Sequence, residues 1–81
     1  ELMEFPAAMT FKVAGVNREG LAQDIVAVIQ KYLPGDYIPK AKRSSKGTYN
    51  SVSIDIVAQN FEQVETLYQE LAKVEGIKMV I

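Results

Sequence analysis

Two stretches of the chain alternate apolar and polar residues with a period of two, which is the pattern of a strand with one buried face. The first runs from about Ala8 to Ala14, and the second extends from Gly47 to Val57. Both therefore predict strands that cover a core on one side only. The expected inward-facing residues are Met9, Phe11, Val13, Val52, Ile54 and Ile56, and the expected outward-facing residues are Thr10, Lys12, Ala14, Ser51, Ser53 and Asp55.

An amphipathic helix is predicted after each of these strands. The first begins after Gly20 and ends at Leu33-Pro34-Gly35, where proline and glycine interrupt the pattern. Its apolar stripe is Leu21, Ile25, Val28, Ile29 and Tyr32. The second is expected to begin at Asn60, in a capping box with Gln63, and to end with Gly76 as its C-cap. Its apolar stripe is Phe61, Val64, Leu67, Tyr68 and Leu71.

Two further strands complete the order of elements. Residues 36–43 predict an edge strand, because Pro39 has no N–H for a ladder and nearby lysines discourage pairing with other chains. Residues 77–81 predict the last strand. The order strand, helix, strand, strand, helix, strand is typical of the α+β class, as a ferredoxin-like βαββαβ sandwich. We therefore expect a four-stranded antiparallel sheet of order 4132 with two helices on one face.

Composition narrows the class of protein. With 81 residues, 48% of them hydrophobic, the chain is expected to form a single domain, residues 1–81, with 1–7 as an N-terminal lead-in. The net charge of −1 argues against general binding to nucleic acid or membranes. The sequence has neither a signal-peptide pattern nor an apolar run of about 20 residues, so we expect a cytoplasmic protein. Because the chain begins with Glu1 rather than Met, we expect the native start to lie upstream.

Candidate chemistry is limited by what the chain lacks. The absence of cysteine and histidine removes thiolate nucleophiles, cysteine metal sites and the commonest general base. We therefore expect no catalytic residue, no metal and no cofactor. The spacing from Gly15 to Gly20 imitates a phosphate-binding loop, but Leu21-Ala22 stands where Lys and Ser/Thr are required. The residues Asn17, Arg18 and Gly20 can instead shape a small-ligand notch at the helix start, or form an ordinary connection.

A second candidate site is the basic hairpin 40–49. Its proposed anion- or partner-binding residues are Lys40, Lys42, Arg43, Ser44, Ser45, Lys46 and Tyr49. Positive charge and exposed backbone N–H groups there could capture an anion or an acidic protein surface. The alternative is a solvated edge strand guarded by lysines, with Tyr49 packed over the hairpin. On the open face, Asp55 is expected to pair across the sheet with Lys12.

Five segments of the chain resemble a known family along essentially its whole length. They are Glu4-Phe5-Pro6, Pro34-Gly35-Asp36-Tyr37, Ser44-Ser45-Lys46-Gly47 with Tyr49, Ser51-Val52-Ser53-Ile54, and the run from Glu62 to Tyr68. Together they resemble the YbeD-like family of small bacterial proteins of unknown function. The resemblance implies no activity, but it implies a ferredoxin-like fold similar to ACT regulatory domains. The connection from Asn17 to Leu21 is also similar to the ACT pattern, with Asn17 where those domains often carry Asp.

These observations favour a non-catalytic, ACT-like regulatory or small-ligand-binding module that self-associates through its open sheet face or edges. The alternative is a protein–protein adaptor that uses the basic hairpin. An RNA-binding module of this topology would stack bases on aromatic residues of the central strands, where this chain places Thr10, Ser51 and Ser53. An acylphosphatase-like enzyme would use Arg18, but its loop lacks the clustered glycines of a phosphate cradle.

Overall fold

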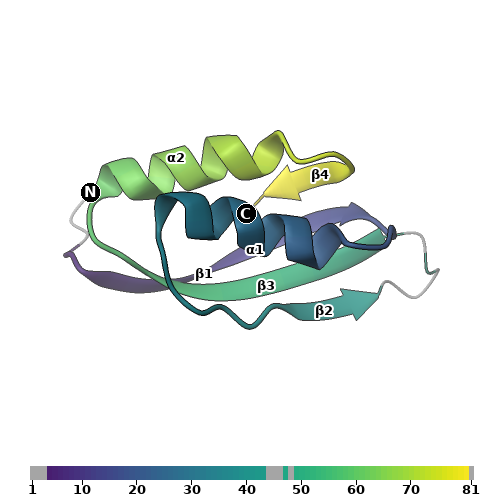
Figure 1. Ribbon diagram of the computed structural model, residues 1–81, viewed down its shortest axis with the longest axis horizontal. Helices are drawn as coiled ribbons and strands as arrows, with labels where there is room; N and C mark the ends of the chain where they lie inside the picture. The colour runs from purple at the N-terminus through teal and green to yellow at the C-terminus, as the bar shows by residue number, and fades with distance from the viewer. Residues whose placement is uncertain (1–3, 44–46, 48, 81) are drawn as a thin grey trace.

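The computed structural model describes residues 4–43, 47 and 49–80. The elements are β1 (Ala7–Val16), α1 (Leu21–Tyr32), β2 (Lys40–Arg43), β3 (Tyr49–Ala58), α2 (Phe61–Ala72) and β4 (Ile77–Val80). The strands form one antiparallel sheet in the order β2-β3-β1-β4, and both helices cover the same face of it (Figure 1). Read from the other edge, this is the predicted order 4132, so the predicted ferredoxin-like fold is confirmed.

The core lies between the two central strands and the helices. In the register of β1 with β3, Phe11 lies opposite Ile54 and Val13 opposite Val52, and all four side chains are buried. The helices cover them with buried residues at helical spacing: Leu21, Ile25 and Ile29 from α1, and Leu67 and Leu71 from α2. The predicted inward face of both strands is confirmed, with Met9 only partly buried.

The strand bounds differ from the predicted ones. β1 is longer at both ends, and Ala7, which we expected in the lead-in, is its first residue. The second strand is much shorter: β2 contains only Lys40–Arg43 rather than residues 36–43. Since Pro39 cannot donate to the ladder, pairing with β3 starts only at Lys40. Gly47, predicted in the turn before the third strand, has a left-handed backbone at φ 71°, and β3 runs from Tyr49 to Ala58, one residue beyond the expected end at Val57.

The start of α2 follows the prediction and its end does not. Asn60 is the N-cap, and its Oδ1 accepts the backbone N–H of Gln63 at 2.9 Å. The return bond of the capping box goes to a different residue, since Gln63 Oε1 accepts the N–H of Gln59 at 2.7 Å. α2 ends at Ala72, and Gly76 was wrongly predicted as its C-cap, because a turn over residues 73–76 separates them.

The buried stripe of α2 is narrower than predicted. The side chains of Phe61 and Tyr68 are 53% and 42% exposed, so neither belongs to the closed core. Tyr68 still packs against the core, with the centroid of its ring 5.7 Å from that of Phe11 in an edge-to-face arrangement. Phe61 is the first helical residue, where the helix has only begun to cover the sheet.

The open face of the sheet carries a different pair from the predicted one. Thr10 is the residue opposite Asp55, and its hydroxyl donates to Asp55 Oδ1 at 2.6 Å. Lys12 instead lies opposite Ser53. The predicted Lys12–Asp55 pair was therefore wrong, because Asp55 lies opposite Thr10, two positions before Lys12 in β1.

Candidate functional site

The connection between β1 and α1 leaves the helix start without a side-chain cap. Gly20 occupies the N-cap position at φ 84°, and no side chain there accepts a hydrogen bond from the first turn. A left-handed backbone of this kind favours glycine. Because first-turn amides have no acceptor inside their own helix, the N–H groups of Ala22 and Gln23 point out of the helix end. The positive end of the helix dipole lies at the same place.

Arg18 braces this connection against the rest of the fold. Its Nε donates to the carbonyl of Glu75 at 3.0 Å, one terminal nitrogen donates to Glu19 O at 3.2 Å, and the other forms a 2.7 Å ion pair with Asp24. Its side chain is only 28% exposed. Three nitrogens of the guanidinium group thus form hydrogen bonds that link the β1–α1 connection to α1 and to the turn before β4. Its role as a ligand contact stays a prediction.

Asn17 joins the two candidate sites that the sequence placed apart. Its Nδ2 donates to the carbonyl of Gly47 at 3.1 Å, and its Oδ1 accepts from Nδ2 of Asn50 at 3.0 Å. The start of α1 is therefore tied to the end of the basic hairpin. A ligand at one of these places would lie beside the other.

A groove of about 320 Å³ opens beside this helix start, and we call it the α1 groove. It is lined by residues 18–23 together with Ala41, Asn50 and Val52. Ala41 of β2 lies opposite Val52 of β3, so the groove lies on the helix-covered side of the sheet. Of the predicted ligand residues, Arg18 and Gly20 line it, and Asn17 reaches it through Asn50. Sequence reasoning missed Gln23, which lies in the first turn of α1, and it missed Ala41 and Asn50, which only the strand register brings to the helix start.

The basic hairpin is divided between the two faces of the sheet. Lys40 and Lys42 lie opposite Ser53 and Ser51 and therefore share the open face, whereas Arg43 lies opposite Asn50. All three are exposed, and none forms an ion pair with another described residue. Tyr49, at the start of β3, is 46% exposed. Ser44, Ser45 and Lys46 lie outside the described residues.

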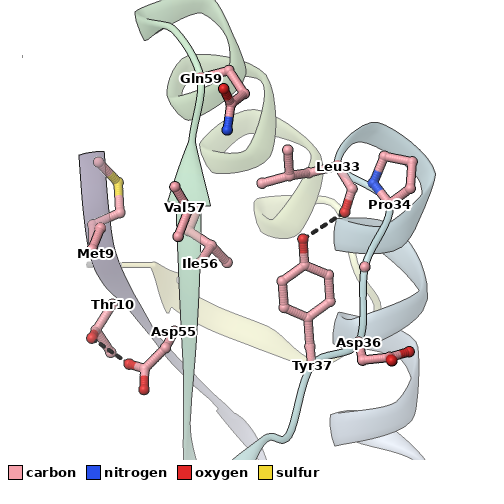
Figure 2. A pocket seen from close by; sticks show the side chains of 12 residues that line it. Met9, Thr10, Leu33, Pro34, Asp36, Tyr37, Asp55, Ile56, Val57 and Gln59 are labelled. Atoms are coloured by element: carbon pink, nitrogen blue, oxygen red, sulfur yellow. Dashed lines mark hydrogen bonds between the residues drawn. The ribbon is translucent and has the colours of Figure 1, made fainter. Parts of the chain in front are cut away.

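A larger groove of about 630 Å³ lies at the opposite end of α1, and we call it the edge groove (Figure 2). It is lined by residues 8–10, 33–37 and 55–57 together with Gln59. Figure 2 shows the loop after α1 on one side and β3 on the other, with the Tyr37 ring between them. The Tyr37 hydroxyl donates to the Leu33 carbonyl at 2.6 Å, and burial raises the pKa of this hydroxyl. No predicted site residue lines this groove.

Two features are absent from the described part of the chain. Its aspartate and glutamate residues form no group of three or more that could hold a metal ion. None of its helices is long and apolar enough to cross a membrane.

Comparison with solved structures shows what the fold is similar to. The solution structure of protein HP0495 from H. pylori has a TM-score of 0.85 at 10% identity, covering 100% of this chain and 87% of that one. The crystal structure of the ACT domain from GTP pyrophosphokinase of Chlorobium tepidum has a TM-score of 0.67 at 23% identity, covering 91% and 94%. At these identities the likeness concerns the fold alone, which is ACT-like.

Comparison of sequences shows the family. A family model described as "Protein of unknown function (DUF493)" matches residues 1–81. A UPF0250 protein of Haemophilus influenzae is 83% identical over all 81 residues, which cover 88% of that protein. A UPF0250 protein of Pasteurella multocida is 62% identical over the same residues, covering 92% of its length. The expected membership in a family of small bacterial proteins of unknown function is confirmed, while the narrower YbeD-like resemblance stays an expectation. The chain therefore belongs to the DUF493 family, whose bacterial relatives carry the name UPF0250.

Proposed function

We propose that this protein is a cytoplasmic, non-catalytic regulatory module that binds a small carboxylate-bearing ligand in the α1 groove. The observation that carries the proposal is the uncapped start of α1 at the wall of that groove. Backbone N–H groups and the helix dipole favour an anionic group at this point. Asn50 and Glu19 on the groove wall offer partners for a hydroxyl or ammonium group elsewhere on the ligand. The ACT-like fold supports a regulatory role.

Self-association belongs to the same proposal. The open face carries small side chains at Ala14, Ser51 and Ser53, so another sheet or helix can approach it closely. At its rims Val57 and Met79 are 50% and 56% exposed, which adds apolar area to an interface. We expect sedimentation equilibrium from micromolar to millimolar protein to show an oligomer, and ligand to shift that equilibrium.

Gln23→Glu tests the ligand site without removing a part of the fold. Gln23 is exposed and lines the α1 groove. A carboxylate there interacts favourably with the helix dipole, so we expect the free energy of unfolding to stay equal or rise by about 0.3–1 kcal/mol. The same charge repels an anionic ligand, so we expect binding to weaken about fivefold to tenfold, or about 1–1.4 kcal/mol. Ligand-detected NMR with a panel of amino acids and small carboxylates measures this.

The matched control is Gln69→Glu, which adds the same charge at an exposed position on α2. We expect it to leave binding unchanged, and we expect ligand to shift the amide signals of Ala22 and Gln23 in the wild type. No response to any member of the panel, or equal losses in both variants, would contradict the α1 groove as the binding site.

The basic hairpin supports a second candidate function, that of an adaptor for an acidic protein surface. The specific observation is that all four residues of β2 are exposed while its lysines share one face. We expect Lys40→Glu with Lys42→Glu to remove an anionic partner from a pull-down. The melting temperature should change by only a few degrees, because exposed charges contribute little to stability. Identical partner lists for the wild type and the double variant would contradict the adaptor function.

A further inference from the structure

Half of the outer edge of β3 is left without a neighbouring strand. β2 pairs with β3 only from Asn50 to Ser53, whereas β3 continues to Ala58. Every second residue of a strand directs its backbone N–H and C=O toward a given side. Among the described residues, no backbone hydrogen bond joins residues 34–39 to β3. The outer edge of β3 therefore has no strand partner among the described residues from Ile54 to Ala58, and Asp55 and Val57 are its exposed positions. An edge without a partner is a template for another extended chain.

The loop that passes this edge is held to α1 rather than to β3. The Tyr37 hydroxyl donates a hydrogen bond to the Leu33 carbonyl at the end of α1, and Gln30 Nε2 donates to Gly35 O at 3.0 Å. Pro39 then has no N–H to offer before β2 begins. The edge groove lies between this loop and β3 and also reaches residues 8–10 of β1. Figure 2 shows the Tyr37 ring on the loop side of β3. The gap is therefore fixed by contacts of the loop with its own helix.

The lining of the edge groove indicates the chemistry of its occupant. Its walls are apolar at Met9, Leu33 and Ile56, and its charged residues are the carboxylates Asp36 and Asp55, with no lysine or arginine. Two apolar side chains are also exposed here: Val57, in the lining, is 50% exposed, and Ile38, which follows Tyr37 in the chain, is 82% exposed. A free backbone edge can pair with another extended backbone, and the carboxylates favour cationic side chains on that partner.

We propose that the edge groove binds an extended segment of a partner protein, which adds to β3 as a strand. Its backbone would pair with β3 between Ile54 and Ala58, and lysine or arginine side chains would alternate with apolar ones. The alternation follows from the pleat, because successive side chains of a strand point to opposite faces. This inference does not depend on the proposed ligand, since the α1 groove lies at the other end of α1.

The probe is the capped hexapeptide Ac-Lys-Val-Lys-Val-Lys-Val-NH₂, titrated into ¹⁵N-labelled protein. We expect the largest amide shifts between Ile54 and Ala58, and slower hydrogen exchange at the outward-facing amides among them. Two peptide controls separate the contribution of backbone hydrogen bonds to binding from that of charge. A version N-methylated on every residue should bind at least about tenfold more weakly, because it has no N–H left with which to form the ladder. A version with glutamate in place of lysine should bind more weakly by a similar factor.

Asp36→Lys tests the charge complementarity on the protein side. Asp36 is exposed, so we expect the variant to fold normally and to bind the lysine peptide about threefold to tenfold more weakly. Glu65→Lys is the matched control, because it makes the same charge change on α2, outside the groove. We expect it to bind like the wild type.

Three results would overturn the proposal. One is absence of binding by the lysine peptide, and another is binding that survives N-methylation, which would mean charge attraction without strand addition. The third is slower hydrogen exchange at the outward-facing amides of Ile54–Ala58 as the concentration of protein alone rises, which would identify a second copy of the chain paired with this edge. Association through the open face would leave these backbone groups without a new hydrogen-bond partner. A response confined to the amides of Ala22 and Gln23 would contradict this proposal, and it would not support the ligand site either, because the capped peptide has no carboxylate.

Discussion

Ile54→Asp is expected to unfold the protein. Ile54 is 1% exposed in the middle of β3, directly opposite Phe11 of β1. A carboxylate at this position would be buried among apolar side chains without a partner, at a cost of several kcal/mol. A domain of this size is stable by only about 4–12 kcal/mol, so the substitution removes most or all of that. Circular dichroism during a urea titration measures the loss.

The control is the same substitution one residue earlier. Ser53 lies opposite Lys12 on one side and Lys40 on the other, so an aspartate there meets two positive charges on the open face. We expect Ser53→Asp to change the free energy of unfolding by no more than about 1 kcal/mol, since exposed pairs contribute little. Equal unfolding midpoints for the two variants would show that the strand does not bury alternate residues in the way described.

The central part of the fold could be predicted because local pattern and burial agree there. In β1 and β3 every second residue is apolar, and a sheet covered on one face buries those residues. The helices that follow have their apolar residues three and four positions apart, which places them over that face. With four strands and two helices in this order, few topologies remain, so the strand order followed as well.

The edge of the sheet could not be predicted in the same way. Residues 36–39 have a mixed pattern, in which Tyr37 and Ile38 are both apolar and neighbours. Whether such a segment pairs with β3 depends on contacts with α1, and the sequence does not show the Tyr37 hydroxyl reaching Leu33. The predicted strand was therefore too long, and the edge groove that its absence creates was missed. The one available signal was Pro39 directly before the sequence Lys40-Ala41-Lys42-Arg43.

The sequence could place the residues of the candidate ligand site, but it could not predict their contacts. The sequence located Asn17, Arg18 and Gly20 at the start of the first helix, and the structure shows them there. It could not show that Arg18 reaches Glu75, 57 residues further along the chain, because that contact requires the turn before β4 to pack against the β1–α1 connection. Ionisable residues near a helix start are thus ambiguous until the rest of the fold is known.

Beside this site, the backbone of β1 at Gly15 closely approaches the backbone of the turn before β4 at Gly76. The pairing of β1 with β4 shifts its register between Ala14 and Gly15, and the N–H of Val16 then donates to Gly76 O at 2.9 Å. A Cβ on Gly15 would lie 2.9 Å from that carbonyl oxygen, 3.2 Å from Leu21 Cδ2 and 3.3 Å from Ile77 Cδ1. Glycine is required here by the lack of space, because the first of these contacts is with backbone that cannot rotate away.

Gly15→Val is therefore expected to destabilise the protein by about 3 kcal/mol or more, at the upper end of overpacking costs. Its side chain would push the Gly76 carbonyl away, weakening the bond to Val16 and the neighbouring Arg18–Glu75 contact. Urea unfolding gives the free energy, and hydrogen exchange should show faster exchange at the Val16 amide. Ala14→Val is the matched control, because it adds a β-branched side chain one residue earlier, on the open face, where we expect a change within about 1 kcal/mol. Equal free energies of unfolding for Gly15→Val and Ala14→Val, with the Val16 amide still protected from exchange, would contradict this prediction. They would mean that the turn before β4 moves away from residue 15 without cost.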